Sequence, residues 1–171
     1  RHIWTRIKSG ARLASDDSLF MDHLFEKYDT RNFAEIDQRQ QLHPNSIVLA
    51  QAALETGWGT SRFFLQGKNA FGIWSYNAME DRMPAQSGRG ALKIYLREYD
   101  NLLQSVRDYF TTMANSWAFD TFRKKRAETD NAYELIWYLN KYSELRNDYV
   151  KLIGDLMITN DTGPRHFAAA L

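Results

Sequence analysis

The most informative stretch of the sequence reads NSIVLAQAALETGWG and covers residues 45–59. Its first twelve residues would carry apolar side chains almost all the way round a helix, which is typical of a helix buried in a core. Gly57 follows at once, with Gly59 close behind, and glycine commonly ends helices because it adopts a left-handed backbone without strain. The stretch therefore predicts a buried helix that stops at Gly57.

One carboxylate, that of Glu55, lies in the last turn of this predicted helix. Desolvation in an apolar setting disfavours the charged form and raises the pKa, so the group can donate a proton near neutral pH. Gln51 lies one turn earlier and can share the same face. Alternatively, the Glu55 side chain reaches solvent past the glycines, and the residues alone leave both interpretations open.

The rest of the chain predicts an α+β fold that is mainly α. Apolar and polar residues alternate from Leu92 to Arg97, which indicates a strand paired with a segment near residues 71–80. Apolar residues at helical spacing predict one helix over 15–29 and three more that begin at Asp100, Asp130 and Ser143. We expect a groove where this small β lobe meets the helices.

The composition excludes several classes of function and of site. The 171 residues suit one domain with a sizeable core, and the net charge of +1 argues against a nucleic-acid-binding protein. The basic run RKKRAE at 123–128 is interpreted as a solvated helix face. There is no cysteine and no stretch of 18 apolar residues, so we expect neither disulfides nor a transmembrane segment. Because the chain starts at Arg1 without methionine, we interpret it as a fragment that lacks any signal segment.

Histidines and tryptophans give weaker signals. The four histidines lack metal-ligand spacing, so no metal and no cofactor is expected, and His43 before Pro44 is interpreted as a loop residue. Aromatic residues make up 14% of the chain, which suits either a rich core or a surface on which sugar rings stack. Trp58 is expected in the core, whereas Trp74 suits the core and the groove equally.

Two consecutive stretches, LAQAALETGWGTSRF (49–63) and GKNAFGIW (67–74), carry a long and specific pattern. It resembles the glucosaminidase domains of glycoside hydrolase family 73, most of all the Bax-type bacterial members. Later motifs of the family are similar to REYDNLLQSVRDYF (97–110) and LNKYSELRNDYVKLI (139–153). The resemblance covers about residues 40–157, so we treat 1–171 as one glucosaminidase-like domain with residues 1–39 as a helical N-terminal extension.

The resemblance implies a lysozyme-like helical domain with a small β lobe that flanks a glycan-binding groove. It implies hydrolysis of the β-1,4 bond after N-acetylglucosamine in peptidoglycan, with Glu55 as catalytic acid and Tyr142 as active-site tyrosine. The family pattern places the groove floor at Asn69, Phe71 and Gly72. The further residues expected to bind substrate are Trp74, Asp81 and Tyr149.

Glycoside hydrolysis normally uses a second carboxylate, about 5–5.5 Å from the first for retention or about 6.5–9.5 Å for inversion. The β lobe offers Glu80 as first choice and Asp81 as second, with Glu98 as a third acid in the same lobe. If the 2-acetamido oxygen of the substrate is the nucleophile, no second carboxylate is needed in that role. The residues leave this choice open.

The expected partner is the glycan strand of peptidoglycan and not a nucleic acid, and the protein is expected to act as a monomer. Peptidoglycan places it in the periplasm, in the cell envelope or outside the cell. Three other functions remain open on the same residues: a lytic transglycosylase, a muramidase, or a wall-binding module without turnover. The competing enzymes differ from the first in the chemical ends of their products.

Overall fold

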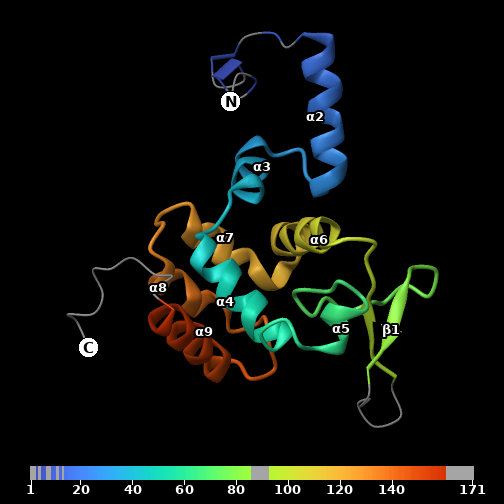
Figure 1. The fold of residues 1–171 in the computed structure, drawn as a ribbon. Helices are drawn as coiled ribbons and strands as arrows, with labels where there is room; N and C mark the ends of the chain where they lie inside the picture. Colours follow the sequence, from blue (N-terminus) through green and yellow to red (C-terminus); the bar gives the residue numbers. More distant parts are fainter. Residues whose placement is uncertain are drawn as a thin grey trace. The chain divides into compact units, whose positions relative to one another are not determined.

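The structure is a computed structural model of the chain, and it describes residues 14–85 and 93–160 together with positions 3, 5, 6, 9, 10 and 12. Contacts divide the chain into two compact units, Arg1–Gln41 and Leu42–Leu171. The first unit holds helices α2 (Ser15–Tyr28) and α3 (Phe33–Gln40) (Figure 1). Helix α3 was not predicted, although Asn32 caps it by accepting from the backbone N–H groups of Ala34 and Glu35.

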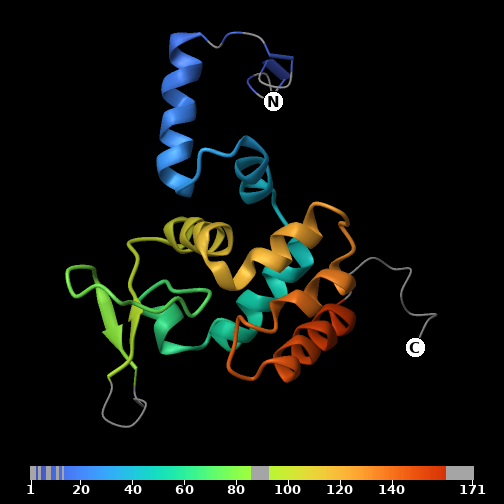
Figure 2. The same ribbon diagram turned by 180° about the vertical axis from the view of Figure 1, so that it is seen from behind.

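The second unit is built around helix α4 (Asn45–Thr56), which α6 (Leu102–Asn115), α7 (Asp120–Arg126) and α9 (Asn147–Thr159) surround (Figures 1 and 2). The short elements are α5 (Arg62–Leu65), η1 (Trp117–Phe119), α8 (Ala132–Leu135) and η2 (Ile136–Leu139). The predicted mainly α fold with a small β lobe is confirmed. Among the described residues, no helix has both the length and the apolar character needed to cross a membrane.

Helix α4 ends as the sequence predicts. Gly57 takes a left-handed backbone (φ 54°), and the N–H of Trp58 donates to the carbonyl of Ala53 at 2.8 Å. The helix is not buried all round, however, because Leu49 is 58% exposed. Trp58 is also 65% exposed, so its expected place in the core is wrong: its left-handed backbone (φ 58°) turns its side chain out of the helix line.

The β lobe is an antiparallel pair in which β1 (Arg82–Pro84) faces β2 (Tyr95–Arg97), with Met83 opposite Leu96. The predicted partner near residues 71–80 is also present, because Trp74 forms an isolated bridge with Leu96 on the other side of β2. The N–H of Ser75 donates to Tyr95 O at 2.8 Å, and that of Arg97 donates to Ile73 O at 3.0 Å. Leu92, the first residue of the predicted strand, lies outside the described residues.

Three predicted helix starts are displaced by one to four residues. Asn101 and Asn131, rather than Asp100 and Asp130, accept the capping hydrogen bonds of α6 and α8. Ser143 accepts from the N–H of Leu145 in a turn, and α9 begins only after Arg146, whose left-handed backbone (φ 53°) separates the two. Neighbouring Asp, Asn and Ser side chains compete as caps, and the sequence pattern does not distinguish them.

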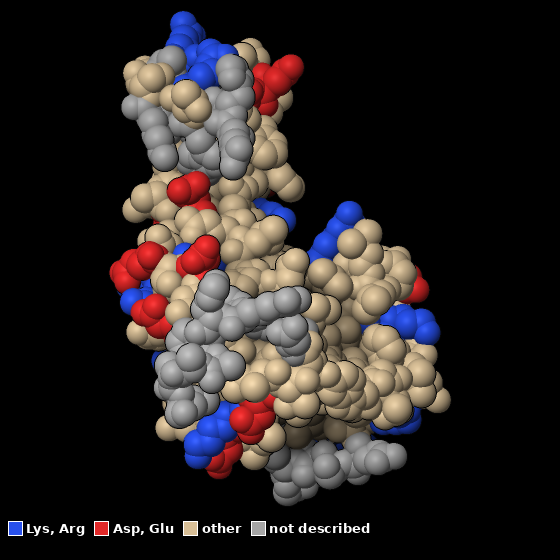
Figure 3. Space-filling view, turned by 60° about the vertical axis from the view of Figure 1, so that its left-hand side comes forward, with Lys and Arg blue, Asp and Glu red and all other residues tan. Residues whose placement is uncertain are grey.

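The basic run at 123–128 is not a solvated face throughout. Arg123 and Arg126 are 4% and 7% exposed, while Lys124 lies at the surface. Arg123 donates to the backbone carbonyls of Met113 and Ser116 at 3.0 and 2.8 Å, so its charge is satisfied inside the fold. On the face drawn in Figure 3, acidic and basic side chains are interspersed around a broad uncharged area.

The core of the second unit lies between α4, α6 and the C-terminal helices. Its largest apolar members, each less than 2% exposed, are Phe122, Ile47, Met113, Leu135, Leu139, Ile153, Met157 and Val150. Contacts between α4 and α9 are the most extensive between any two helices of the unit. This packing fixes the C-terminal end of α4, where Glu55 lies.

Two isoleucines of α9 test this core. We expect Ile153→Ala to lower the free energy of unfolding by about 2–5 kcal/mol, because Ile153 is 1% exposed and its loss leaves a cavity. Ile158→Ala, on the same helix but 53% exposed, is expected to change it by less than about 0.5 kcal/mol. Urea unfolding of both variants measures the difference, and equal losses would contradict the packing described.

Candidate active site

The carboxyl group of Glu55 lies at the C-terminal end of α4 in a largely buried position. Desolvation raises its pKa from 4.5 to about 7, and a hydrogen bond from Tyr149 partly opposes that rise. The expectation that Glu55 escapes to solvent past the glycines is therefore not met. A carboxyl group with this pKa carries a proton near neutral pH and can give it up to a ligand.

The backbone at Gly72 lies directly against Glu55. A Cβ atom built on Gly72 would be 2.8 Å from Glu55 Oε2, closer than real Cβ atoms approach an oxygen. Gly72 also has a left-handed backbone (φ 64°) that side chains other than glycine's rarely adopt. Glycine is therefore favoured here by its conformation, and any other residue would also displace the Glu55 carboxyl group.

Asn69 holds this segment in place from inside the fold. Its amide nitrogen donates to the carbonyls of Ile73 and Arg97 at 3.0 and 2.9 Å, and its oxygen accepts from the N–H of Ile73 at 3.1 Å. The side chain is 2% exposed, so these bonds are shielded from water. Asn69 thus ties the turn that carries Gly72 to strand β2.

Two stacked tyrosines lie on the other side of the site. The rings of Tyr142 and Tyr149 are 5.4 Å apart and nearly parallel. Tyr142, in the turn between η2 and α9, donates its hydroxyl hydrogen to the carbonyl of Phe71 at 2.9 Å. Tyr149 instead contacts Gln51, whose amide nitrogen donates to the Tyr149 hydroxyl at 3.0 Å.

A groove of about 470 Å³ passes this site. Aromatic and charged side chains line it alongside the Phe71–Trp74 backbone, and Glu55 lies against Gly72, which belongs to its wall. The lining residues are Phe71, Gly72, Ile73, Trp74, Tyr76, Arg97, Thr112, Ser116, Phe119, Lys141, Tyr142, Ser143, Glu144 and Arg146. In the described part of the chain, no three His, Asp or Glu side chains are placed to hold a metal ion.

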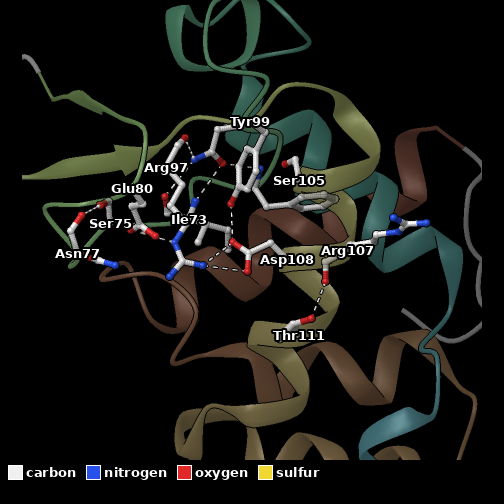
Figure 4. A network of polar contacts seen from close by, with 12 residues as sticks. Ile73, Ser75, Asn77, Glu80, Arg97, Tyr99, Ser105, Arg107, Asp108 and Thr111 are labelled. Atoms are coloured by element: carbon white, nitrogen blue, oxygen red, sulfur yellow. Dashed lines mark hydrogen bonds and ion pairs between the residues drawn. The ribbon is translucent and has the colours of Figure 1, made fainter. Parts of the chain in front are cut away.

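The β lobe meets α6 through a network centred on Arg97 (Figure 4). One guanidinium nitrogen of Arg97 donates to both oxygens of Asp108, at 2.9 and 2.7 Å, and Nε donates to Glu80 at 3.3 Å. Tyr99 donates to the same Asp108 at 2.6 Å. The Ser75 hydroxyl, and then Arg97, lower the pKa of Glu80, whereas desolvation raises that of Glu55.

The glucosaminidase family model, described as mannosyl-glycoprotein endo-beta-N-acetylglucosaminidase, matches residues 30–162. The chain belongs to the glucosaminidase family. Protein bax of Escherichia coli K12 is 33% identical to this chain over 95 residues. The match covers 56% of this chain and 32% of that protein, so the chain spans about a third of the length of this relative.

Solved structures share the fold of this chain. The catalytic domain of the autolysin Auto from Listeria monocytogenes superposes with a TM-score of 0.57 at 18% identity, over 93% of this chain and 94% of that one. A peptidoglycan hydrolase from Sphingomonas sp. A1 gives 0.52 at 22% identity, over 78% and 92%. A glycoside hydrolase domain of FlgJ from Salmonella typhimurium gives 0.53 at 16% identity, over 84% and 99%.

The structure brings several of the predicted site residues together. Glu55, Gly72, Tyr142 and Tyr149 form one cluster, and Trp74 lines the groove beside it. Tyr149 and Asn69 are both buried, at 1% and 2% exposure, so neither offers a surface on which a sugar could lie. Their contacts point inward, to Glu55 and to the turn at Gly72.

The β-lobe acids lie differently. Glu80 does not line the groove, whereas its partner Arg97 does, and Asp81 and Glu98 are exposed. The backbones of these last two residues are joined by a hydrogen bond from Glu98 N to Asp81 O at 2.9 Å. Of the three candidates, Glu80 is the one tied to the groove wall.

The sequence did not predict the charged residues that line the groove. Arg97, Lys141, Glu144 and Arg146 line it, and nothing in their spacing identifies them, because they come from a strand and from the turn before α9. The closing motif that contains Tyr142 was the available signal, since three of the four lie within four residues of it.

The raised pKa of Glu55 predicts a pH dependence of stability. The folded state binds the proton more tightly, with a pKa of about 7 against 4.5, so stability is fully present below pH 4.5 and falls as the pH rises through 7. The loss is expected to total about 3 kcal/mol. In Glu55→Gln this component is absent. Urea unfolding at pH 5 and pH 8 should therefore give a smaller difference for the variant, and an equal difference would contradict the assignment.

Proposed function

We propose that this glucosaminidase hydrolyses the β-1,4 bond after N-acetylglucosamine in peptidoglycan, with Glu55 as the general acid. The observation that carries the proposal is a largely buried carboxyl group with a raised pKa behind the wall of an aromatic groove. Family membership supports the bond that is cut. The structural relatives described as an autolysin and a peptidoglycan hydrolase support the polymer.

In this proposal Glu55 gives its proton to the glycosidic oxygen, the C–O bond breaks, and the leaving sugar departs with a hydroxyl group. Positive charge develops at the anomeric carbon, and an ionised group or the substrate's own acetamido oxygen stabilises it. A water molecule then supplies the new hydroxyl at that carbon. Glu55, as a carboxylate, regains a proton from this water.

Glu80 is our candidate for the ionised carboxylate. Enzymes that use two carboxyl groups separate their pKa values, and here the pKa of Glu55 is raised while that of Glu80 is lowered. Its ion pair with Arg97 connects it to the groove. Asp81 stays the second choice, and acetamido assistance would leave Glu80 with a supporting role only.

The groove supplies the means to bind a glycan. Trp74 and the 84% exposed Tyr76 have their rings 6.2 Å apart on one side, where they offer apolar faces to sugar rings. Lys141 and Arg146 offer donors on the side of the turn before α9. Tyr142, held to the carbonyl of Phe71, is proposed to fix the groove floor and to present its hydroxyl oxygen to the substrate.

Peptidoglycan as substrate also implies a place and a partner. We propose that the protein acts as a monomer on glycan strands outside the cytoplasm, in the periplasm, in the envelope or after secretion. Neither a nucleic acid nor a cofactor is part of the proposed reaction.

Glu55→Gln tests the acid directly. It keeps the size of the side chain and removes the ionisable proton, so we expect turnover of purified peptidoglycan to fall by at least ~100-fold. Mass spectrometry of the wild-type products identifies the bond: new reducing N-acetylglucosamine ends support the proposal. Anhydro-muramic ends would indicate a lytic transglycosylase, reducing muramic ends a muramidase, and binding without products a wall-binding module.

Three matched variants test the second carboxylate. We expect Glu80→Gln to reduce turnover by at least ~10-fold, because it removes the ionised group joined to the groove by Arg97. Asp81→Asn tests the second choice, and Glu98→Gln, exposed in the same lobe, is the control; if Glu80 is the carboxylate, both should stay near wild type. Near-normal turnover in all three would favour acetamido assistance and would contradict the role of Glu80.

A further inference from the structure

A row of buried polar side chains crosses the core of the second unit and ends at Glu55. Its members come from α4, α6, α7, α9 and the loop before α4, and each is at most 7% exposed. Arg126 Nη1 lies 3.4 Å from His43 Nδ1, and the other ring nitrogen of His43, Nε2, lies 2.6 Å from the Tyr109 hydroxyl. That hydroxyl lies 2.6 Å from Gln51 Oε1. Gln51 Nε2 in turn lies 3.0 Å from the Tyr149 hydroxyl. Interaction with the Tyr149 hydroxyl lowers the pKa of Glu55, which places this hydroxyl next to the carboxyl group at the end of the row.

The cation at the far end determines the direction of the whole row. A guanidinium group has only donors, so the His43 nitrogen that faces Arg126 is an acceptor. His43 is also neutral, because desolvation, and then the charge of Arg126, lower its pKa to about 3. A neutral imidazole carries one hydrogen, and in His43 that hydrogen is therefore on Nε2, the atom that faces Tyr109.

Each following group then has one possible orientation. The Tyr109 oxygen accepts from His43, so its own hydrogen goes to Gln51 Oε1. Gln51 therefore presents its amide nitrogen to Tyr149, whose oxygen accepts. The hydrogen of Tyr149 is left for the carboxyl group of Glu55.

The opposite direction gives the opposite result at Glu55. With the Gln51 amide turned round, Tyr149 would donate to Gln51 and present only lone pairs to Glu55. Tyr109 would donate to Nε2 of His43, and the hydrogen on Nδ1 would face the guanidinium of Arg126. Two donors would then oppose each other between side chains that are only 3% and 7% exposed, which disfavours this arrangement.

We propose that Arg126 fixes the direction of a hydrogen-bond chain through His43, Tyr109 and Gln51, and that the chain makes the Tyr149 hydroxyl a donor to Glu55. These residues act through Glu55 and touch no substrate, so they are positioning residues of the acid. The proposal rests on the proposed function in one respect only, namely that Glu55 is the acid whose proton matters for turnover. The chain favours the carboxylate over the protonated form and aims its oxygens at one donor.

The groups around the two ends are few. Tyr149 of α9 and Tyr142 of the preceding turn are the titratable groups that face Glu55, and the segment at Gly72 brings none. Arg126 of α7 and Tyr109 of α6 face His43, which the rings of Phe110 and Phe122 also contact. His43 and Arg126 also line a cavity of about 410 Å³, whose wall carries Asp130 as a further titratable group.

Nuclear magnetic resonance tests the direction without reference to activity. The nitrogen shifts of the His43 ring in the wild-type protein should show Nε2 protonated and Nδ1 unprotonated. The reverse assignment, or a charged ring at pH 6, would overturn the proposal.

A carbon-13 titration of the Glu55 carboxyl group tests the far end. Tyr149→Phe removes the donor and keeps the ring, so the pKa of Glu55 and the alkaline limb of the pH–rate profile should rise together by about one pH unit. Tyr138→Phe is the matched control, since Tyr138 is half-buried against the same core and outside the chain. An unchanged Glu55 pKa in Tyr149→Phe would overturn the proposal.

Arg126 tests the remote link. Arg126→Met should allow the Nδ1–H form of His43 and raise the Glu55 pKa. Arg126→Lys keeps the charge and a donor, so it should change the position of the His43 hydrogen and the Glu55 pKa less. If Arg126→Met leaves the His43 hydrogen on Nε2, the proposed role of Arg126 is wrong.

The same data separate the two proposals, namely the hydrogen-bond chain and the role of Glu55 as the acid. If Glu55→Gln keeps its turnover and the Glu55 pKa rises as expected in Tyr149→Phe, then the hydrogen-bond chain is present but Glu55 is not the acid. If Glu55→Gln loses turnover but the Glu55 pKa is unchanged in Tyr149→Phe, then Glu55 is the acid and the proposed hydrogen-bond chain is wrong. Because the titration needs only folded protein, thermal unfolding of each variant accompanies it.

Discussion

Burial of the Glu55 carboxyl group is the constraint on which the site depends. A carboxyl group held away from water must be protonated or receive hydrogen bonds, and here both conditions are partly met. The neighbouring segment makes room for this carboxyl group, because the residue that lies against it, Gly72, has no side chain. Asn69 and Tyr142 then hold that backbone from two directions, through Arg97 and Phe71 respectively.

The β lobe depends on a second charged contact. Arg97 joins a strand of only three residues to the middle of α6 through the bidentate bond to Asp108, and the same guanidinium holds Glu80 (Figure 4). A two-stranded ribbon is marginal by itself in water, so it needs an anchor of this kind. The position of Glu80 relative to the helices is therefore set by α6 as much as by the turn in which it lies.

Where local chemistry determines the structure, the sequence was sufficient. The run of apolar residues before Gly57 predicted α4 and its end, and the carboxylate in that run predicted a carboxyl group whose pKa is raised by desolvation. Residues whose environment comes from distant segments were predicted less well. The sequence predicts Arg123 and Arg126 to be surface cations, because their partners come from α6 and from the loop at His43. Trp58 looks like core until its left-handed backbone turns it outward.

The course of the hydrogen-bond chain has an electrostatic consequence of its own. Helix α4 starts near His43 and ends at Glu55, so its backbone dipole places partial negative charge beside the carboxyl group. The side-chain dipoles from His43 to Tyr149 run alongside in the opposite sense and bring their positive end to the same place. Two antiparallel dipoles attract each other and oppose each other's potential at Glu55. The proton affinity of this group therefore reflects a difference between two large fields, and a small change in either is felt there.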